Sequence, residues 1–205
     1  MTKEVPQFRV NVRWTPALIF LVLVNLVPII GVFAFGWDIA TILALYWLET
    51  IVIGALNVPK MWACEGGVGG KTFITIFFIV HFGMFCWGHM TFLNSTFKTK
   101  PVLDSVWDGG PLSWTVLTLL ISHTFSMVTN FFGKREYVGR LPNEQMFFPY
   151  GRIVVMHVVI IIGGFLALII GAPAAALLLL IVLKTGMDIA VHSLEHDGKP
   201  MHTMG

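Results

Sequence analysis

The chain has 205 residues, of which 56% are hydrophobic and only 12% are charged, and its formal net charge is +2. Its mean hydropathy of +0.81 reflects more apolar surface than a soluble domain of this size can bury. Composition therefore predicts a membrane protein. No polar stretch is long enough to form a second domain, and the scattered basic residues give no support for nucleic-acid binding.

Six apolar segments each have close to the roughly 20 residues that are needed to cross a hydrocarbon core. Lipid offers no hydrogen-bond partners to an open backbone, so each segment is expected to be a helix. The predicted fold is an all-α, polytopic bundle of six transmembrane helices at 15–198, with an N-terminal arm at 1–14 and a tail at 199–205. The segments are residues 16–36, 39–58, 72–93, 113–132, 153–171 and 174 to about 194.

The basic residues are distributed unequally between the two sides of this bundle. One side carries only Lys98 and Lys100, whereas ten basic residues fall on the other side. The positive-inside rule then predicts cytoplasmic termini and a place in an inner membrane. The ten are Lys3, Arg9, Arg13, Lys60, Lys71, Lys134, Arg135, Arg140, Arg152 and Lys199.

Ionisable residues recur inside the predicted spans, where each is costly unless it is paired or hydrated. Counting along the helices predicts one layer near the midplane and a second layer nearer the cytoplasm. His89 is expected to be alone in the outer half of the third span, where a structural role is the simpler interpretation. The midplane layer holds Glu49, His81, His123 and Lys184, and the cytoplasmic layer includes His157, Asp188 and His192.

The last span carries a polar stripe, because Lys184, Asp188, His192 and His196 recur every fourth residue. A carboxylate and an imidazole at this spacing form half of a first-row metal site. His157 on the preceding span would be the third ligand, with a position left open for water. The prediction is a divalent metal, zinc above all, with His196 or Glu49 as the next ligand. The alternative for Lys184 and Asp188 is a salt bridge that neutralises both charges.

Glu49 falls near the midplane of its span, where an unpaired carboxylate would take up a proton. We therefore expect it to be neutral or to contact Lys184, His81 or His123. Its candidate roles are general base, second metal ligand or counter-ion of Lys184. His81 and His123 match in predicted depth, so they are also candidate ligands of a non-covalent haem.

The chain resembles a family of small multi-pass bacterial and archaeal membrane proteins that is known as a domain of unknown function. The resemblance rests on four stretches of sequence and implies a prokaryotic multi-pass membrane protein without an assigned reaction. The stretches are Tyr46-Trp-Leu-Glu49 leading to Asn57-Val-Pro-Lys60, the region from His81 to His89, Pro149-Tyr-Gly-Arg152 before His157, and the region from Lys184 to His196.

A looser analogy is to membrane hydrolases of the alkaline ceramidase and adiponectin-receptor type. Those proteins hold zinc between helices with three histidines and an aspartate, parts that His157, Asp188, His192 and His196 could take. They have seven spans, however, and their histidine motif has no aspartate spaced as Asp188 is.

Four functional classes follow from these features. A metal-dependent hydrolase acting on a lipid or another membrane-embedded substrate is favoured, with Glu49 or Asp188 moving protons. A proton or metal-ion transporter is the second hypothesis, and it needs polar groups that continue to the outer face. The sequence favours the hydrolase because these groups thin out above His81. A haem-binding subunit and a purely structural subunit are the third and fourth hypotheses.

Overall fold

The computed structural model describes residues 27–158, residue 169, residues 181–183 and residues 185–186. Every regular element in these ranges is a helix, and they contain no strand, which confirms the predicted all-α fold. The predicted arm and tail lie outside the described residues. So do Lys184, Asp188, His192 and His196.

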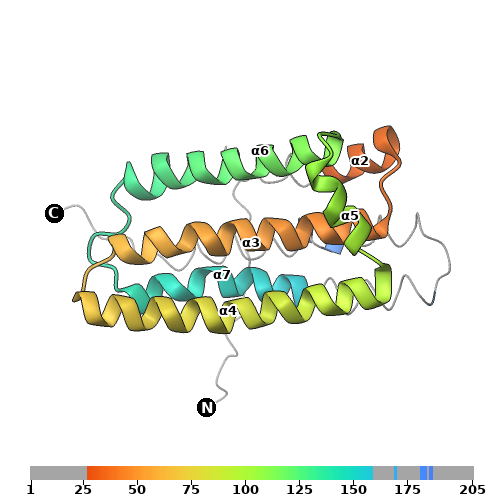
Figure 1. Cartoon of the computed structure of the whole chain (residues 1–205). Helices are drawn as coiled ribbons and strands as arrows, with labels where there is room; N and C mark the ends of the chain where they lie inside the picture. The colour runs from red at the N-terminus through yellow and green to blue at the C-terminus, as the bar shows by residue number, and fades with distance from the viewer. Residues whose placement is uncertain (1–26, 159–168, 170–180, 184, 187–205) are drawn as a thin grey trace, which may run out of the picture.

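Four long helical segments run side by side along the bundle (Figure 1). The α3 helix lies between α6 on one side and α4 and α7 on the other, and it contacts all three. Two short elements connect the far ends of α4 and α6. In chain order the elements are α2 (Val27–Phe35), α3 (Ile39–Ala63), α4 (Val68–Phe97), α5 (Lys100–Asp104), η1 (Ser105–Trp107), α6 (Pro111–Ser126), η2 (Met127–Phe132) and α7 (Pro142–Val158).

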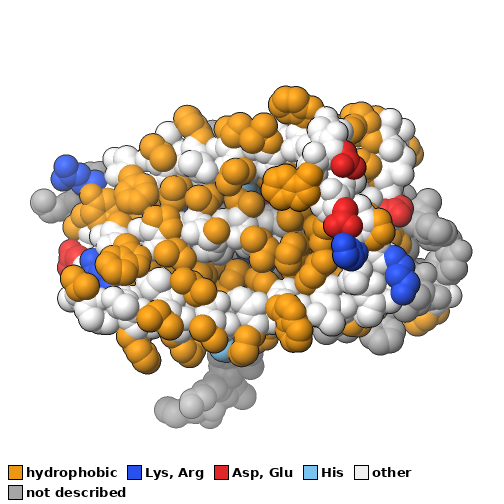
Figure 2. Space-filling model, in the orientation of Figure 1, with side chains coloured by type: hydrophobic (Ala, Val, Ile, Leu, Met, Phe, Trp, Pro, Cys, Tyr) orange, Lys and Arg blue, Asp and Glu red, His pale blue; other side chains and the backbone are white. Residues whose placement is uncertain are grey.

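Three of the described helices are long and apolar enough to cross a membrane: α3, α4 and the continuous segment Pro111–Phe132. They correspond to the second, third and fourth predicted spans, each matching or extending the predicted bounds. The α3 helix begins where expected because Asp38 caps it, accepting hydrogen bonds from the backbone N and the hydroxyl of Thr41. Hydrophobic side chains cover the middle of the visible face, and charged ones gather toward its two ends (Figure 2).

The α7 helix begins eleven residues before the predicted fifth span, so the boundary predicted at Ile153 is wrong. Pro142 supplies a first helical residue that needs no donor, and the Glu144 carboxylate accepts a hydrogen bond from Leu141 N at 2.9 Å. Arg152, which was expected in a cytoplasmic loop, therefore lies well inside a helix.

Cross-helix contacts fix how α7 lies against its neighbours. It runs antiparallel to α3, since Asn57 pairs with Gln145 near one end and Glu49 with Arg152 farther along. It runs parallel to α4, on which His81 and His89 contact residues 69 and 68 positions later. Side chains on α7 that are separated by one or two turns therefore meet different polar partners at successive levels of the bundle.

Candidate functional site

An ion cluster, made of Glu49 on α3, His123 on α6 and Arg152 on α7, joins three helices inside the bundle. Arg152 Nη1 donates a hydrogen bond to Glu49 Oε1 at 2.9 Å, and His123 Nε2 lies 3.6 Å from the same oxygen. The Glu49 side chain is 11% exposed, compared with 24% for His123 and 32% for Arg152. The carboxylate is thus the most enclosed member and is contacted by both basic groups.

The chemistry of the ion cluster follows from the types of side chain in it. A guanidinium stays protonated in proteins, so Arg152 supplies a permanent positive charge beside the Glu49 carboxylate. Together the two form a neutral pair, which lowers the cost of enclosing either charge. An imidazole is the side chain that normally changes protonation between pH 5 and pH 8. His123 adds an imidazole, which can donate or accept a hydrogen bond, beside the same carboxylate oxygen.

An amide pair ties α3 to α7 near the end of the bundle that carries the 133–141 loop. Gln145 Nε2 donates to Asn57 Oδ1 at 2.7 Å, and Asn57 Nδ2 donates to the Gln145 carbonyl oxygen at 3.3 Å. Arg140 Nη1 donates to the remaining Gln145 oxygen, Oε1, at 2.7 Å. Asn57 and Gln145 are both buried, and their polar groups satisfy each other. Asn57 therefore joins α3 to α7.

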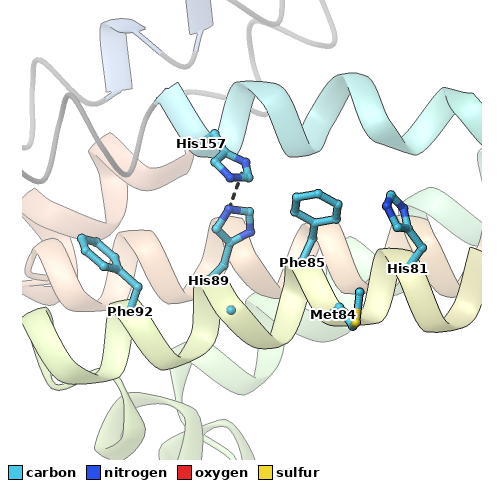
Figure 3. Close-up of a pocket in the computed structure, with 7 residues that line it drawn as sticks. His81, Met84, Phe85, His89, Phe92 and His157 are labelled. Atoms are coloured by element: carbon cyan, nitrogen blue, oxygen red, sulfur yellow. Dashed lines mark hydrogen bonds between the residues drawn. The ribbon is translucent and has the colours of Figure 1, made fainter.

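Two further polar contacts join α4 to α7. His81 Nδ1 lies 2.7 Å from the Tyr150 hydroxyl, and His89 Nε2 lies 3.1 Å from His157 Nδ1. The same His157 nitrogen is 3.1 Å from the carbonyl oxygen of Ile153, one turn earlier. His89 is buried, and its Nδ1 has no hydrogen-bond partner among the residues that the structure describes. Figure 3 shows His157 pointing from α7 toward His89 on α4.

A pocket of about 520 Å³ opens beside these histidines. The labelled side chains in Figure 3 show Phe85 between His89 and His81 on the same helix. Among the described residues that line it, none is Asp, Glu, Lys or Arg. The pocket therefore combines apolar walls with imidazole groups as its main polar features. It is lined by His81, Met84, Phe85, Gly88, His89, Phe92 and His157.

The structure brings together only part of the predicted site. Glu49 and His123 meet as expected, whereas the proposed haem ligands His81 and His123 each have a different polar partner. His157 lies beside His89, so the prediction that His89 has no companion is wrong. The cause is the earlier start of α7, which moves His157 farther from the loop end of the bundle. Within the described ranges, no three His, Cys, Asp or Glu residues form a metal-binding group.

Sequence reasoning missed the two α7 residues that complete these contacts, Tyr150 and Arg152. The sequence contains a usable signal, because Gln145, Tyr150 and Arg152 lie less than three helical turns before the apolar run that starts at Ile153. A helix that begins earlier than this run would include all three. Pro142 followed by Glu144 is also typical of a helix start. Pro149 and Gly151 obscured this pattern by lowering the apparent helical character, yet α7 continues through both residues.

Comparison with known proteins supplies the family. A model described as a family of unknown function (DUF6498) matches residues 10–204. The chain belongs to this family. No curated protein and no solved structure matches it. The DUF6498 match includes the ion cluster, the amide pair and all four residues of the α4–α7 contacts, so these features lie within the family region.

Proposed function

We propose that this chain is an integral membrane protein that binds and transfers protons within its helical bundle, as part of transport across the membrane. Three long apolar helices and the hydrophobic side chains over the middle of the face drawn in Figure 2 support the membrane assignment. The proposal keeps six spans with cytoplasmic termini, in the inner membrane of a prokaryote. Removing Arg152 from the loop count still leaves most basic residues on the side of the 133–141 loop.

The observation that carries the proposal is the sharing of Glu49 Oε1 by His123 and Arg152. Arg152 keeps the carboxylate paired in every protonation state of His123. When His123 binds a proton, it gains an attraction to Glu49, and when it loses the proton the remaining pair stays neutral. The ion cluster can therefore hold or release a proton without leaving an unpaired charge in the bundle.

A series of polar contacts extends from the ion cluster along α7. Gln145 and His157 are twelve residues apart, which corresponds to about 18 Å along the helix axis. Between them, Tyr150 contacts His81 and Arg152 contacts Glu49. The continuation to His157 and His89 supports transport over hydrolysis, because polar groups persist on the side of His81 where the sequence predicted that they thin out.

The experiment is proton flux into liposomes that contain the purified full-length chain and an internal pH-sensitive dye. A potassium gradient with valinomycin would drive the flux. We expect the parent protein to conduct protons, and His123→Phe and Glu49→Gln to reduce the flux at least tenfold. Thr118→Ala is the matched control, since Thr118 on α6 bonds only to the Trp114 carbonyl oxygen. Parent flux equal to that of empty liposomes, or unchanged flux in both cluster variants, would contradict the proposal.

A metal-dependent membrane hydrolase is the second candidate, with His157, Asp188 and His192 as zinc ligands and His196 or Glu49 as the next. It is supported by Leu183, which packs against the apolar cluster that contains Val155 and Met156 next to His157. Bound zinc would polarise a carbonyl group and activate water for attack on a lipid-like substrate. In this mechanism the chain's own carboxylates, Glu49 or Asp188, would accept and return the proton.

Elemental analysis of protein from metal-replete cells tests this second candidate. Stoichiometric zinc that is lost in both Asp188→Ala and His192→Ala, but retained in His202→Ala, would favour it. Absence of metal from the parent protein would remove it. An absorption spectrum of the same sample tests haem binding, because a haem band that is lost in His81→Ala or His123→Ala would revive that hypothesis.

A further inference from the structure

The pocket between α4 and α7 presents ring nitrogens to a ligand as well as apolar walls. His81 and His157 both line it, and each has its Nδ1 engaged in a protein contact. Neither Nε2 has a hydrogen-bond partner within the described part of the chain. Both rings are therefore oriented by the protein and keep one nitrogen available for a bound molecule.

The protein contacts also determine what these nitrogens can do. The Ile153 carbonyl oxygen can only accept, so its contact with His157 Nδ1 favours the tautomer with the proton on that nitrogen. Nε2 of neutral His157 is then an acceptor. The Tyr150 hydroxyl can either donate to or accept from His81 Nδ1, so His81 Nε2 can take either role. One end of the pocket thus accepts a hydrogen bond, and the other end adapts to its ligand.

Aromatic rings form the wall between the two nitrogens. The Phe85 ring centroid lies 5.1 Å from that of His81 and 5.8 Å from that of His157, edge to face in both cases. Gly88, one turn after Phe85, leaves open space, since a Cβ atom built there meets nothing within 4 Å. A flat ring can lie over Phe85 and above Gly88. The described lining residues carry no Lys or Arg to pair with a carboxylate or phosphate, which favours an uncharged ligand.

We propose that this pocket binds the quinol form of a para-quinone, with the ring against Phe85, one hydroxyl donating to His157 Nε2 and the other hydroxyl directed to His81. The ring centroids of His81 and His157 lie 5.1 and 5.8 Å from that of Phe85, so they are no farther apart than the sum of these two distances. That distance fits one six-membered ring with oxygens on opposite edges and two hydrogen bonds of about 2.8 Å each. In the quinone both oxygens are carbonyls, which His81 Nε2 can match by donating but acceptor Nε2 of His157 cannot, so the quinol should bind more tightly than the quinone.

The apolar part of the pocket suits the remainder of such a molecule. Met84 and Phe92 line its sides, and both are exposed on the surface of a helix that is long enough to span a membrane. A hydrocarbon tail can therefore leave the pocket past these two apolar side chains. The volume of about 520 Å³ lies within the usual range for small-molecule sites. The inference does not depend on proton transfer by the ion cluster.

The test is binding of decylubiquinone and its quinol to the full-length protein in detergent, measured by isothermal titration calorimetry. We expect saturable binding of the quinol at one site, tighter than that of the quinone and weakened about three- to tenfold by His81→Phe and by His157→Leu for each lost hydrogen bond. Gly88→Leu should abolish binding because it fills open space, and its thermal midpoint should be no lower than that of the parent because leucine has the higher helix propensity. Thr91→Val is the matched control, since Thr91 lies on α4 outside the pocket lining.

Three outcomes would overturn the proposal. The first is that the parent shows no saturable binding. The second is that Gly88→Leu and both histidine variants bind as tightly as the parent, which would indicate partition into the detergent or the protein surface. The third is that dodecanol, an apolar chain with one hydroxyl, displaces the quinol of decylubiquinone with equal affinity, because the ring and the second oxygen would then contribute nothing.

Discussion

Glu49 and Arg152 are 103 positions apart in the sequence, yet their side chains form a 2.9 Å hydrogen-bonded ion pair between α3 and α7. Removing one partner should leave the other charged group enclosed in the bundle without this ion pair and hydrogen bond. We predict that Glu49→Gln and Arg152→Gln each lower the free energy of unfolding by about 2 kcal/mol, a value reduced from that of fully buried pairs because Arg152 is partly exposed.

The double variant distinguishes an interaction from two independent effects. Glu49→Gln combined with Arg152→Gln should cost less than the sum of the single changes, as measured by denaturant titration in detergent. Lys100→Gln serves as the control, because the Lys100–Asp104 pair is about two-thirds exposed at both side chains and should contribute nothing measurable. Strict additivity would show that Glu49 and Arg152 do not stabilise each other.

The amide pair gives a prediction for a neutral contact. Asn57→Ala removes one partner of buried Gln145 and leaves its amide group unsatisfied, which should cost about 1–3 kcal/mol. Asn130→Ala is the matched control, since Asn130 Nδ2 bonds to Ser126 on its own helix at a more exposed position. Equal unfolding free energies for the two variants would contradict a role for the amide pair in joining α3 to α7.

Hydropathy predicted the bounds of the apolar helices α3, α4 and α6 well. It placed the start of α7 too late, because the first turns of that helix contain polar residues that are paired with other helices. Hydropathy predicts the α3 helix from Ile39 onward because its long apolar run contains only one acidic residue, Glu49. The start of α7 contains Glu144 and Gln145 and was therefore assigned to a loop. Gln145 is compatible with the bundle because Asn57 satisfies it, a compensation that becomes visible only when two distant segments are placed together.

The candidate site shows the same division. The expected contact between Glu49 and His123 follows from depth alone, because both residues fall near the middle of their helices. The contact between His89 and His157 could not be predicted once the start of α7 was placed too late, since each residue counted along a helix moves a side chain by about 1.5 Å. Placing the start of a helix eleven residues too late shifts the expected depth of each side chain by about 16 Å, which is enough to put His157 and His89 in different layers.

The orientation of the bundle can be tested at the two ends of α4. Lys98 caps the C-terminal end of α4. Arg140 lies at the opposite end, in a loop whose backbone bonds to Glu65 shortly before α4 begins. Reporter fusions at Lys98 and Arg140 should report opposite sides of the membrane, with Arg140 on the cytoplasmic side. The same side for both fusions would exclude α4 as a spanning helix.

Cys64 gives a prediction for pH dependence at the end of α3. It is buried, and burial raises the pKa of its thiol, so at any given pH less thiolate is present than in an unfolded chain. In a Cys86→Ser background, Cys64 should be alkylated more slowly in the folded protein than in the denatured protein. The rise of the alkylation rate with pH should also occur at a higher pH in the folded protein. Mass spectrometry after iodoacetamide treatment measures both rates. Identical pH profiles would contradict the predicted shift.

Gly54 on α3 permits close approach of the Phe82 ring on α4, because a Cβ atom at Gly54 would overlap that ring. The ring has little freedom to move, since it packs against Phe78 and Tyr150 with centroid distances of 4.9 and 5.9 Å. Gly54→Ala should therefore destabilise the bundle by about 1–3 kcal/mol through overpacking. Phe82→Leu should cost less in the Gly54→Ala background than in the parent, because the smaller side chain relieves the overlap.

Gly83 on α4 provides the matched control for this steric effect. A Cβ atom there meets nothing within 4 Å, so Gly83→Ala gains helix propensity without a clash and should stabilise the protein by about 0.5–1 kcal/mol. Unfolding free energies of the four variants, measured under one set of detergent conditions, separate the two contributions. If Gly54→Ala were as stable as Gly83→Ala, Gly54 would have no role in the approach of α3 to α4, and the contact between these helices would have to be looser than the one described here.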